Sequence, residues 1–383
     1  MPSFAAGATD VLSAEAAKAA AQHLAQAAAF AVDVEADAMH AFKARLCFVQ
    51  LGTDEQIFLF DTLSPGVSAA ELALPFADPS RTKYFHAAGG DLQYLAEAGV
   101  RVRGLFDTHR AATLLGWPKV GLADLAQERL GITLAKEHQQ SDFSLRPLPP
   151  GMRDYIANDV RYLCEIGRQV REACRKVDVF EEVELDCQRM ADEAAARPDQ
   201  STQAPKVSAA GLSPAQKVLA QAIAAELHAC RLTWAEAANV PMGRMLSNAA
   251  ITAVATRPPQ NEQELKRCQG VRGPFVREHG KEVLERVARL TALSREGKLE
   301  APASDRAPRD RHRKAREDAL KLFRAEAALA RKVTPSAVMP NWLVDSLAEA
   351  PPANLEALGR VPYFGEKRVT LYGANLVALL AGA

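Results

Sequence analysis

The sequence predicts an α/β domain, in which helices flank a mixed sheet, followed by two all-helical domains. Short apolar runs with strand character come first, and strand-like and helix-like segments then alternate up to residue 176. This order of elements is typical of a mixed sheet with helices packed on it. Beyond residue 176 the strand pattern disappears and helical periodicity continues, so the rest of the chain is predicted to be helical.

The composition sets bounds on size, charge and compartment. A chain of 383 residues with 48% hydrophobic and 25% charged residues is long enough for two or three globular domains. Lys plus Arg equals Asp plus Glu at 47 each, so any surface that binds nucleic acid must be local. The six cysteines include no CxxC pair, which argues against a zinc site or a disulfide framework and favours the cytoplasm.

The elements of the first domain follow from the pattern of apolar and turn residues. An alanine-rich run at 13–29 predicts an amphipathic surface helix, because its charged residues exclude a signal peptide or a membrane span, and no membrane is expected as a partner. Another helix opens at Asp91. Strands are expected at 30–37, 45–52, 56–61, 83–87 and 105–108, and further helices at 109–115, 121–130 and 152–176.

Polar stretches that contain proline divide the chain into domains. The two helical domains resemble repeats of one unit about ninety residues apart. Asn239–Leu246 compares with Val333–Pro340, and Cys268–Phe275 compares with Leu358–Gly365. The expected division is an α/β domain at 1–176, a connecting helix and linker at 177–212, a helical domain at 213–293, a linker at 294–308 and a second helical domain at 309–383.

Two acids lie within the apolar run at 30–37. In an extended strand Asp33 and Glu35 point to the same face, ~7 Å apart along the chain. Like charges this close need compensation, which water supplies on an exposed edge strand and a divalent cation supplies at a metal site. Taken alone, the pair leaves both explanations open.

Two later segments carry further candidate residues. Asp91 opens a helix after the strand that carries His86, and by itself this position predicts an N-cap. Tyr155 and Asp159 are four residues apart and share a helical face, a spacing that is common on solvated helices. Each segment therefore has an ordinary structural explanation when it is taken alone.

In combination, Asp33-x-Glu35, His86-x4-Asp91 and Tyr155-x3-Asp159 resemble the motifs of the DEDD 3′→5′ exonucleases of the ribonuclease H-like superfamily, in the tyrosine variant. The two helical domains resemble HRDC domains, the second in degenerate form. The surrounding segments resemble the ribonuclease D family at Arg45–Leu51, Phe85–Leu92, Phe106–Gly116, Lys136–Asp142 and Arg146–Pro149.

The chain departs from this family's usual pattern at three places. Val34 stands where Thr or Ser is usual, and Phe143 stands where Trp is usual. Gly89 and Gly90 precede Asp91 in place of residues with side chains. None of these departures removes a metal ligand.

The resemblance implies a ribonuclease H-like fold and two-metal-ion hydrolysis of phosphodiesters. Asp33 would bridge two Mg²⁺ ions, for which Mn²⁺ should substitute. Glu35 and Asp159 would complete the site of one ion, and Asp91 would hold the other. Tyr155 would orient the attacking water. The implied partner is RNA with a free 3′ end, such as a tRNA precursor or another structured RNA, which is trimmed to 5′-mononucleotides.

Contacts with nucleic acid are predicted in both parts of the chain. Gly270 and Gly273 let a backbone turn approach phosphate closely, which favours the basic residues around them. The basic stretch 309–316 is better explained as a solvated linker. The residues predicted to contact nucleic acid are His86, Phe143, Lys266, Arg267, Arg272 and Arg277.

Two alternative functions stay open on the sequence. One is a DNA 3′→5′ exonuclease, because no residue identifies a contact to a 2′-hydroxyl. The other is a nucleic-acid-binding protein with little or no catalysis, although retention of all four acids and the tyrosine argues against it. Protein partners and oligomeric state are not predicted.

Overall fold

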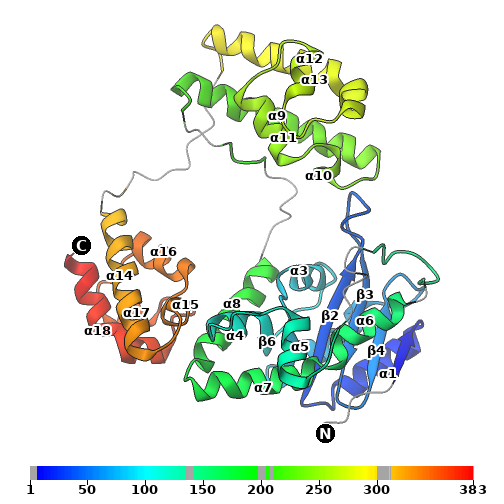
Figure 1. Ribbon diagram of the computed structural model, residues 1–383, viewed down its shortest axis with the longest axis vertical. Coiled ribbons are helices and arrows are strands. Elements are labelled where there is room, and N and C mark those ends of the chain that lie inside the picture. The colour runs from blue at the N-terminus through cyan, green and yellow to red at the C-terminus, as the bar shows by residue number, and fades with distance from the viewer. Residues whose placement is uncertain are drawn as a thin grey trace. The chain divides into compact units, whose positions relative to one another are not determined.

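The computed structural model describes residues 7–134, 138, 141–149, 151–196, 204–207, 211–299, 310 and 312–382. Much of both predicted linkers, Arg309 and Arg311 of the basic stretch, and Lys136 and Gln139 of one family motif lie outside these residues. None of the described helices combines the length and the apolar character that a bilayer crossing requires. The chain divides into two compact units, one of Met1–Ala36, Leu46–Arg197 and Pro308–Ala383, the other of Asp37–Arg45 and Pro198–Ala307 (Figure 1).

A six-stranded sheet in the order β1-β4-β3-β2-β5-β6 forms the centre of the first unit. β3 is antiparallel to β2 and β4, whereas β1 pairs with β4, β2 with β5 and β5 with β6 in parallel. The predicted mixed sheet is therefore confirmed, with β1 as an additional edge strand. The strands are β1 (Ala8–Val11), β2 (Ala29–Ala36), β3 (Leu46–Gly52), β4 (Ile57–Asp61), β5 (Thr82–Phe85) and β6 (Leu105–Asp107).

Helices pack on this sheet, and one of them approaches it closely. All five residues of β4 are buried, which requires cover on both faces of the sheet. A Cβ atom on Gly52 of β3 would lie 2.8 Å from the carbonyl oxygen of Val160, so glycine permits the close approach of α6. The helices before residue 176 are α1 (Ala14–Leu24), the 3-10 helix η1 (Ala69–Leu72), α2 (Ala73–Ala77), α3 (Gly89–Glu97), α4 (Thr108–Leu114), α5 (Leu122–Leu130), α6 (Met152–Arg161) and α7 (Leu163–Lys176).

Two predicted features of this region need correction. The helix expected at 152–176 is two helices, because the first ends at Tyr162, whose backbone N–H donates to the carbonyl oxygen of Val160. The expected connecting helix is α8 (Phe180–Ala196), and its residues Val183 and Cys187 belong to the same hydrophobic core as the sheet. The α/β domain therefore extends beyond the boundary expected at residue 176.

The two helical domains have the same order of helices, which supports the predicted repeat. Each has a long helix, a single turn, a nine-residue helix, a short helix and a long closing helix. The predicted start at Ser213 is present as a capping box with Gln216. The first domain comprises α9 (Pro214–Ala237), α10 (Met242–Met245), α11 (Asn248–Thr256), α12 (Glu262–Arg267) and α13 (Gly273–Arg295), and the second comprises α14 (Arg313–Arg331), α15 (Pro335–Val338), α16 (Asn341–Glu349), α17 (Leu355–Gly359) and α18 (Glu366–Gly382).

The second helical domain packs on the α/β domain through buried charges. Glu182 of α8 is 1% exposed, and its two carboxylate oxygens lie 3.0 Å from Arg331 and 3.1 Å from Lys367. Asp186, one turn later on α8, accepts a hydrogen bond from the indole N–H of Trp342. This domain therefore forms one unit with the sheet, in addition to having its own apolar core.

Candidate active site

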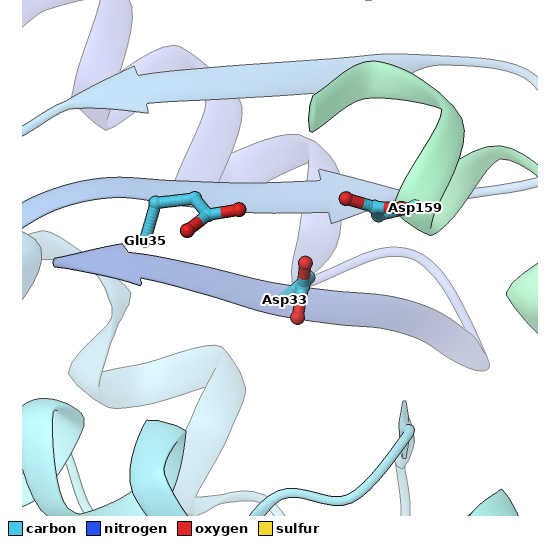
Figure 2. Close-up of side chains that lie close together, drawn as sticks. All are labelled: Asp33, Glu35 and Asp159. Atoms are coloured by element: carbon cyan, nitrogen blue, oxygen red, sulfur yellow. The ribbon is translucent and has the colours of Figure 1, made fainter. Parts of the chain in front are cut away.

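Three carboxylates converge on the face of the sheet that α6 covers. Asp33 and Glu35 project from β2 on the same face as Ala31, the residue that pairs with Gly52 beneath α6. α6 brings Asp159 over this face. One carboxylate oxygen from each of the three acids lies within 4.8 Å of the others, and Figure 2 shows the three side chains around one space.

Asp91 belongs to the first turn of α3. This helix begins at Gly89 after an Ala88 N-cap, so the predicted N-cap role of Asp91 is wrong and its carboxylate is available to the site. Asp91 is not one of the three acids whose oxygens lie within 4.8 Å of one another. It is nevertheless close enough for its charge to raise the pKa of Glu35.

Asp107 fixes the turn that leads into α3. It is 1% exposed, and its carboxylate accepts hydrogen bonds from the backbone N–H groups of Ala87 at 3.1 Å and Ala88 at 2.8 Å. Ala87 has a φ of 61°, a left-handed conformation that is uncommon for a residue with a Cβ atom. Asp107 also caps α4 through the N–H of Arg110. An acid at a strand end before a helix is the sequence signal for such a cap, but nothing in the sequence connects it to Asp91.

Burial raises the pKa of all four acids, and repulsion by neighbouring carboxylates adds to the shift for Glu35, Asp91 and Asp159. Burial raises the pKa of Asp33 to about 6. Burial and the charge of Asp33 raise the pKa of Asp159 to about 8. The pKa of Glu35 rises to about 9, first through burial and then through the charges of the other three acids. The pKa of Asp91 is also raised, again first by burial. Carboxylates whose negative charge is so unfavourable are suitable ligands for a hard divalent cation.

Tyr155 lies one turn before Asp159 on α6, so the two side chains are neighbours and each perturbs the pKa of the other. Burial and the neighbouring carboxylates raise the pKa of Tyr155, so its hydroxyl stays protonated. The ring of Tyr155 contacts His138 edge-on and stacks on Phe143, with ring centroids 5.8 Å and 6.4 Å away. Phe143 is 1% exposed, which contradicts the prediction that it contacts nucleic acid. Its aromatic ring instead supports Tyr155.

His86 follows β5 and faces Thr108. Its Nδ1 lies 2.9 Å from the hydroxyl of Thr108, which itself donates to the carbonyl oxygen of Phe85. Nδ1 therefore donates, and Nε2 is left as an acceptor. Burial lowers the pKa of His86 to about 4, so the ring is neutral at pH 7. A contact between His86 and nucleic acid stays a prediction.

The four basic residues predicted to bind nucleic acid are exposed and lie in the second unit. Gly270, between them, has a φ of 80°, in the left-handed region that favours glycine. Arg267 also lines a cavity of about 1060 Å³ with Lys206 and Arg257. Their contact with nucleic acid stays a prediction. The four are Lys266 and Arg267 in the last turn of α12, Arg272 at the N-cap of α13, and Arg277 within α13.

Known protein families match most of the chain. Residues 9–174 match the family described as 3'-5' exonuclease. Residues 220–287 and 313–380 each match the HRDC domain, so the two helical domains are related to each other as well. The first match covers the sheet and the helices before α8, and the two HRDC matches lie within the two helical domains of the structure.

Two curated relatives and one solved structure extend over nearly the whole chain. Ribonuclease D of Acidiphilium cryptum (strain JF-5) is 30% identical over 359 residues, which cover 92% of this chain and 89% of the relative. Ribonuclease D of Gluconacetobacter diazotrophicus is 29% identical over 354 residues, with 92% and 87% covered. The structure of Escherichia coli RNase D matches with a TM-score of 0.70 at 22% identity and covers 98% of this chain and 99% of that one.

Proposed function

The chain belongs to the ribonuclease D family of 3′→5′ exoribonucleases, and from this membership we propose that it trims structured RNA, such as tRNA precursors, from a free 3′ end. The observation that carries the proposal is the convergence of Asp33, Glu35 and Asp159 within 4.8 Å. The Escherichia coli relative, an exoribonuclease involved in structured RNA processing, supports the class of substrate. The products are 5′-mononucleotides, released one at a time.

Asp33, Glu35, Asp91 and Asp159 hold two divalent cations in this proposal, Mg²⁺ with Mn²⁺ as a substitute. All four donors are carboxylates, the hard oxygen ligands that both cations prefer. Asp33 would be a ligand shared by the two cations, Glu35 and Asp159 would complete one site, and Asp91 would serve the other. When bound, the cations neutralise the charge that develops on the attacking and leaving oxygens at phosphorus.

Tyr155 orients the attacking water rather than removing its proton. Its raised pKa keeps the phenol protonated, and this proton is directed to Asp159. The hydroxyl oxygen can then accept a hydrogen bond from water beside the cluster of acids. Phe143 and His138 limit rotation of the ring, so the hydroxyl keeps one position. Positioning a water in this way contributes to the rate without changing the affinity for the metal.

Neutralising a single acid tests the catalytic assignment. In Asp33→Asn and Asp159→Asn the amide keeps the shape of the side chain but loses the charge, so Mg²⁺-dependent release of mononucleotides should be abolished. Asp154→Asn is the matched control, because Asp154 is exposed on the same helix, α6, and should keep the wild-type rate. Circular dichroism verifies folding. Wild-type rates in Asp33→Asn or Asp159→Asn would overturn the proposal.

The same assay separates RNA from DNA as substrate. A 3′-labelled RNA oligonucleotide and a DNA oligonucleotide of the same sequence are digested in parallel by the wild-type protein. We expect faster release from RNA, in line with the ribonuclease D relatives. Equal rates on the two substrates would leave the exonuclease chemistry in place and contradict the assignment of RNA as the specific substrate.

We also propose that the first helical domain holds the RNA backbone through the exposed basic residues around Gly270. Arg267→Gln, Arg272→Gln and Arg277→Gln combined should weaken binding of structured RNA. They should also reduce the slope of log affinity against log salt by about 2 to 3, since each phosphate contact contributes about 0.7 to 0.9. A variant with Lys217, Lys281 and Arg295 changed to Gln has the same loss of charge elsewhere in this domain. Equal effects of the two triple variants would contradict a local binding site.

A cytoplasmic location completes the proposal. All six cysteines are free thiols in the structure, and reduced thiols are typical of proteins in the cytosol. Fractionation of cells that produce the protein tests this location, and recovery of the protein outside the cytoplasmic fraction would contradict it.

A further inference from the structure

Gln50 is a buried amide in the middle of the sheet. Its side chain is 0% exposed, and neither its Nε2 nor its Oε1 has a hydrogen-bond partner among the described residues. Buried amides in folded proteins almost always have at least one partner, because an unpaired donor or acceptor loses its hydrogen bonds to water without replacement. The amide of Gln50 therefore needs an explanation other than packing.

The register of the sheet places Gln50 beside the candidate metal site. Gln50 of β3 lies directly opposite Asp33 of β2, and on its other side it lies opposite Leu59 of β4. Side chains of directly opposed residues project from the same face, with Cβ atoms about 4.5 to 5.5 Å apart. This is the face that α6 covers at Gly52, two residues along β3. Gln50 thus lies between the helix that carries Asp159 and the strand that carries Asp33.

The apolar neighbours of Gln50 do not explain why a polar amide side chain is buried at this position. Leu59 is 1% exposed and apolar, and α6, which covers this face, contributes the buried apolar residues Ile156 and Val160. Leucine or methionine would fill a similar volume here without burying a donor and an acceptor. On β2, the residue directly opposite Gln50 is Asp33, and its carboxylate can accept a hydrogen bond from the amide N–H of Gln50.

We propose that Gln50 is a positioning residue of the metal site. Its Nε2–H, which has no partner among the described residues, would donate to the carboxylate of Asp33 in the metal-loaded protein and hold it in the orientation that binds the cations. Hydrogen bonds from outside the ligand set orient ligating side chains, and their loss typically weakens metal affinity by about 10- to 100-fold. The donor also stabilises the ionised carboxylate over the protonated one. This inference rests on the proposed function, because it requires that Asp33 is a ligand.

Two apolar variants of Gln50 test the inference in the full-length protein without RNA. Binding of Mn²⁺ is followed by electron paramagnetic resonance of the free ion, and thermal unfolding is measured without metal. We expect Gln50→Met and Gln50→Leu to raise the Kd for Mn²⁺ by about 10- to 100-fold. Their unfolding temperature without metal should equal or exceed that of the wild type, because the unpaired amide is gone.

Leu59→Met is the matched control. It changes the other neighbour of Gln50 on the same face of the sheet, and it should leave the Kd for Mn²⁺ unchanged. A Kd within twofold of the wild type in both Gln50 variants would overturn the inference. Failure of both variants to fold would also overturn it, because Gln50 would then be required for packing alone.

Asp33→Asn separates failure of this inference from failure of the proposed function. If Asp33→Asn loses Mn²⁺ binding while both Gln50 variants keep it, the metal site stands and the role of Gln50 falls. If Asp33→Asn binds Mn²⁺ as the wild type does, Asp33 is no ligand, and both the metal assignment and the inference fall.

Discussion

The raised pKa values of the site acids predict that metal binding releases protons near neutral pH. At pH 7 an acid with a pKa of about 9, as for Glu35, is about 99% protonated. One with a pKa of about 8, as for Asp159, is about 90% protonated, and one with a pKa of about 6, as for Asp33, about 10%. Together these three acids hold about two protons, and Asp91, whose pKa is also raised, adds to this number. Cations must displace these protons because they bind the ionised carboxylates.

This proton release has two measurable consequences. The logarithm of the affinity for Mg²⁺ should rise by at least about two for each pH unit near pH 7, or by at least about 10⁴-fold between pH 6 and pH 8. Isothermal titration calorimetry in two buffers with different ionisation enthalpies should give at least about two protons released when the site is filled at pH 7. The full-length protein without RNA is used, so catalysis does not contribute to the heat.

The control for this measurement is Asp154→Asn, which removes an exposed acid from the same helix as Asp159 and should release as many protons as the wild type. Release of less than about half a proton, or an affinity that stays constant between pH 6 and pH 8, would refute the reasoning. In that case the acids would already be ionised before the metal binds, and something other than a cation would balance their charge.

Three further predictions concern catalysis and stability. Tyr155→Phe should lower the rate of mononucleotide release by about 10²- to 10⁴-fold and leave Mn²⁺ binding unchanged, and an unchanged rate would show that Tyr155 only packs. Without metal, the free energy of unfolding should fall as pH rises from 5 to 9, because acids with a raised pKa in the native state stabilise that state only while they are protonated. Urea unfolding at several pH values measures this free energy, and a rise with pH would contradict the prediction. Arg331→Met should lower the free energy of unfolding, measured in urea, by about 3 kcal/mol, because it leaves buried Glu182 with Lys367 as its remaining ion-pair partner. Its control, Arg360→Met, breaks an exposed pair and should change this free energy by less than about 0.5 kcal/mol.

The acids of the site were predictable where local geometry decides their direction. Alternation along a strand places Asp33 and Glu35 on one face, and the helical repeat places Tyr155 and Asp159 on another. Both relations hold in the structure. That β2 and α6 meet is not a local property, and in the sequence it was indicated only by the resemblance to a known family. Its physical cause is the close approach of α6 to β3 at Gly52, the residue that pairs with Ala31 of β2.

Local patterns failed where a tertiary contact decides the outcome. An aspartate near a helix start predicts an N-cap, but the turn held by Asp107 starts α3 two residues earlier and leaves Asp91 inside the helix. Phe143 lies in a segment without regular structure, which predicts exposure, yet it is buried against Tyr155. The short strand β1 has two polar residues among four and is defined mainly by its pairing with β4.

The boundary of the α/β domain failed for the same reason, and its correction changes the interpretation of the C-terminal domain. α8 is amphipathic and looks like a connector in the sequence, but it reaches the neighbourhood of the site through Asp107, whose backbone N–H donates to the sulfur of Cys187 at 3.3 Å. Asp186 of α8 also forms an ion pair with Arg110, in the helix that Asp107 caps.

The second helical domain contacts the same helix, α8. Its Trp342 donates a hydrogen bond to Asp186 of α8, and its Arg331 and Lys367 form ion pairs with Glu182 of α8. An unbroken series of packed groups therefore leads from the C-terminal domain through α8 to Asp107, and from Asp107 to the turn that starts α3. Because Asp91 lies in the first turn of α3, the second helical domain supports the scaffold of the candidate active site. The first helical domain has its own core, and its exposed basic residues around Gly270 are those that we propose to bind the RNA backbone.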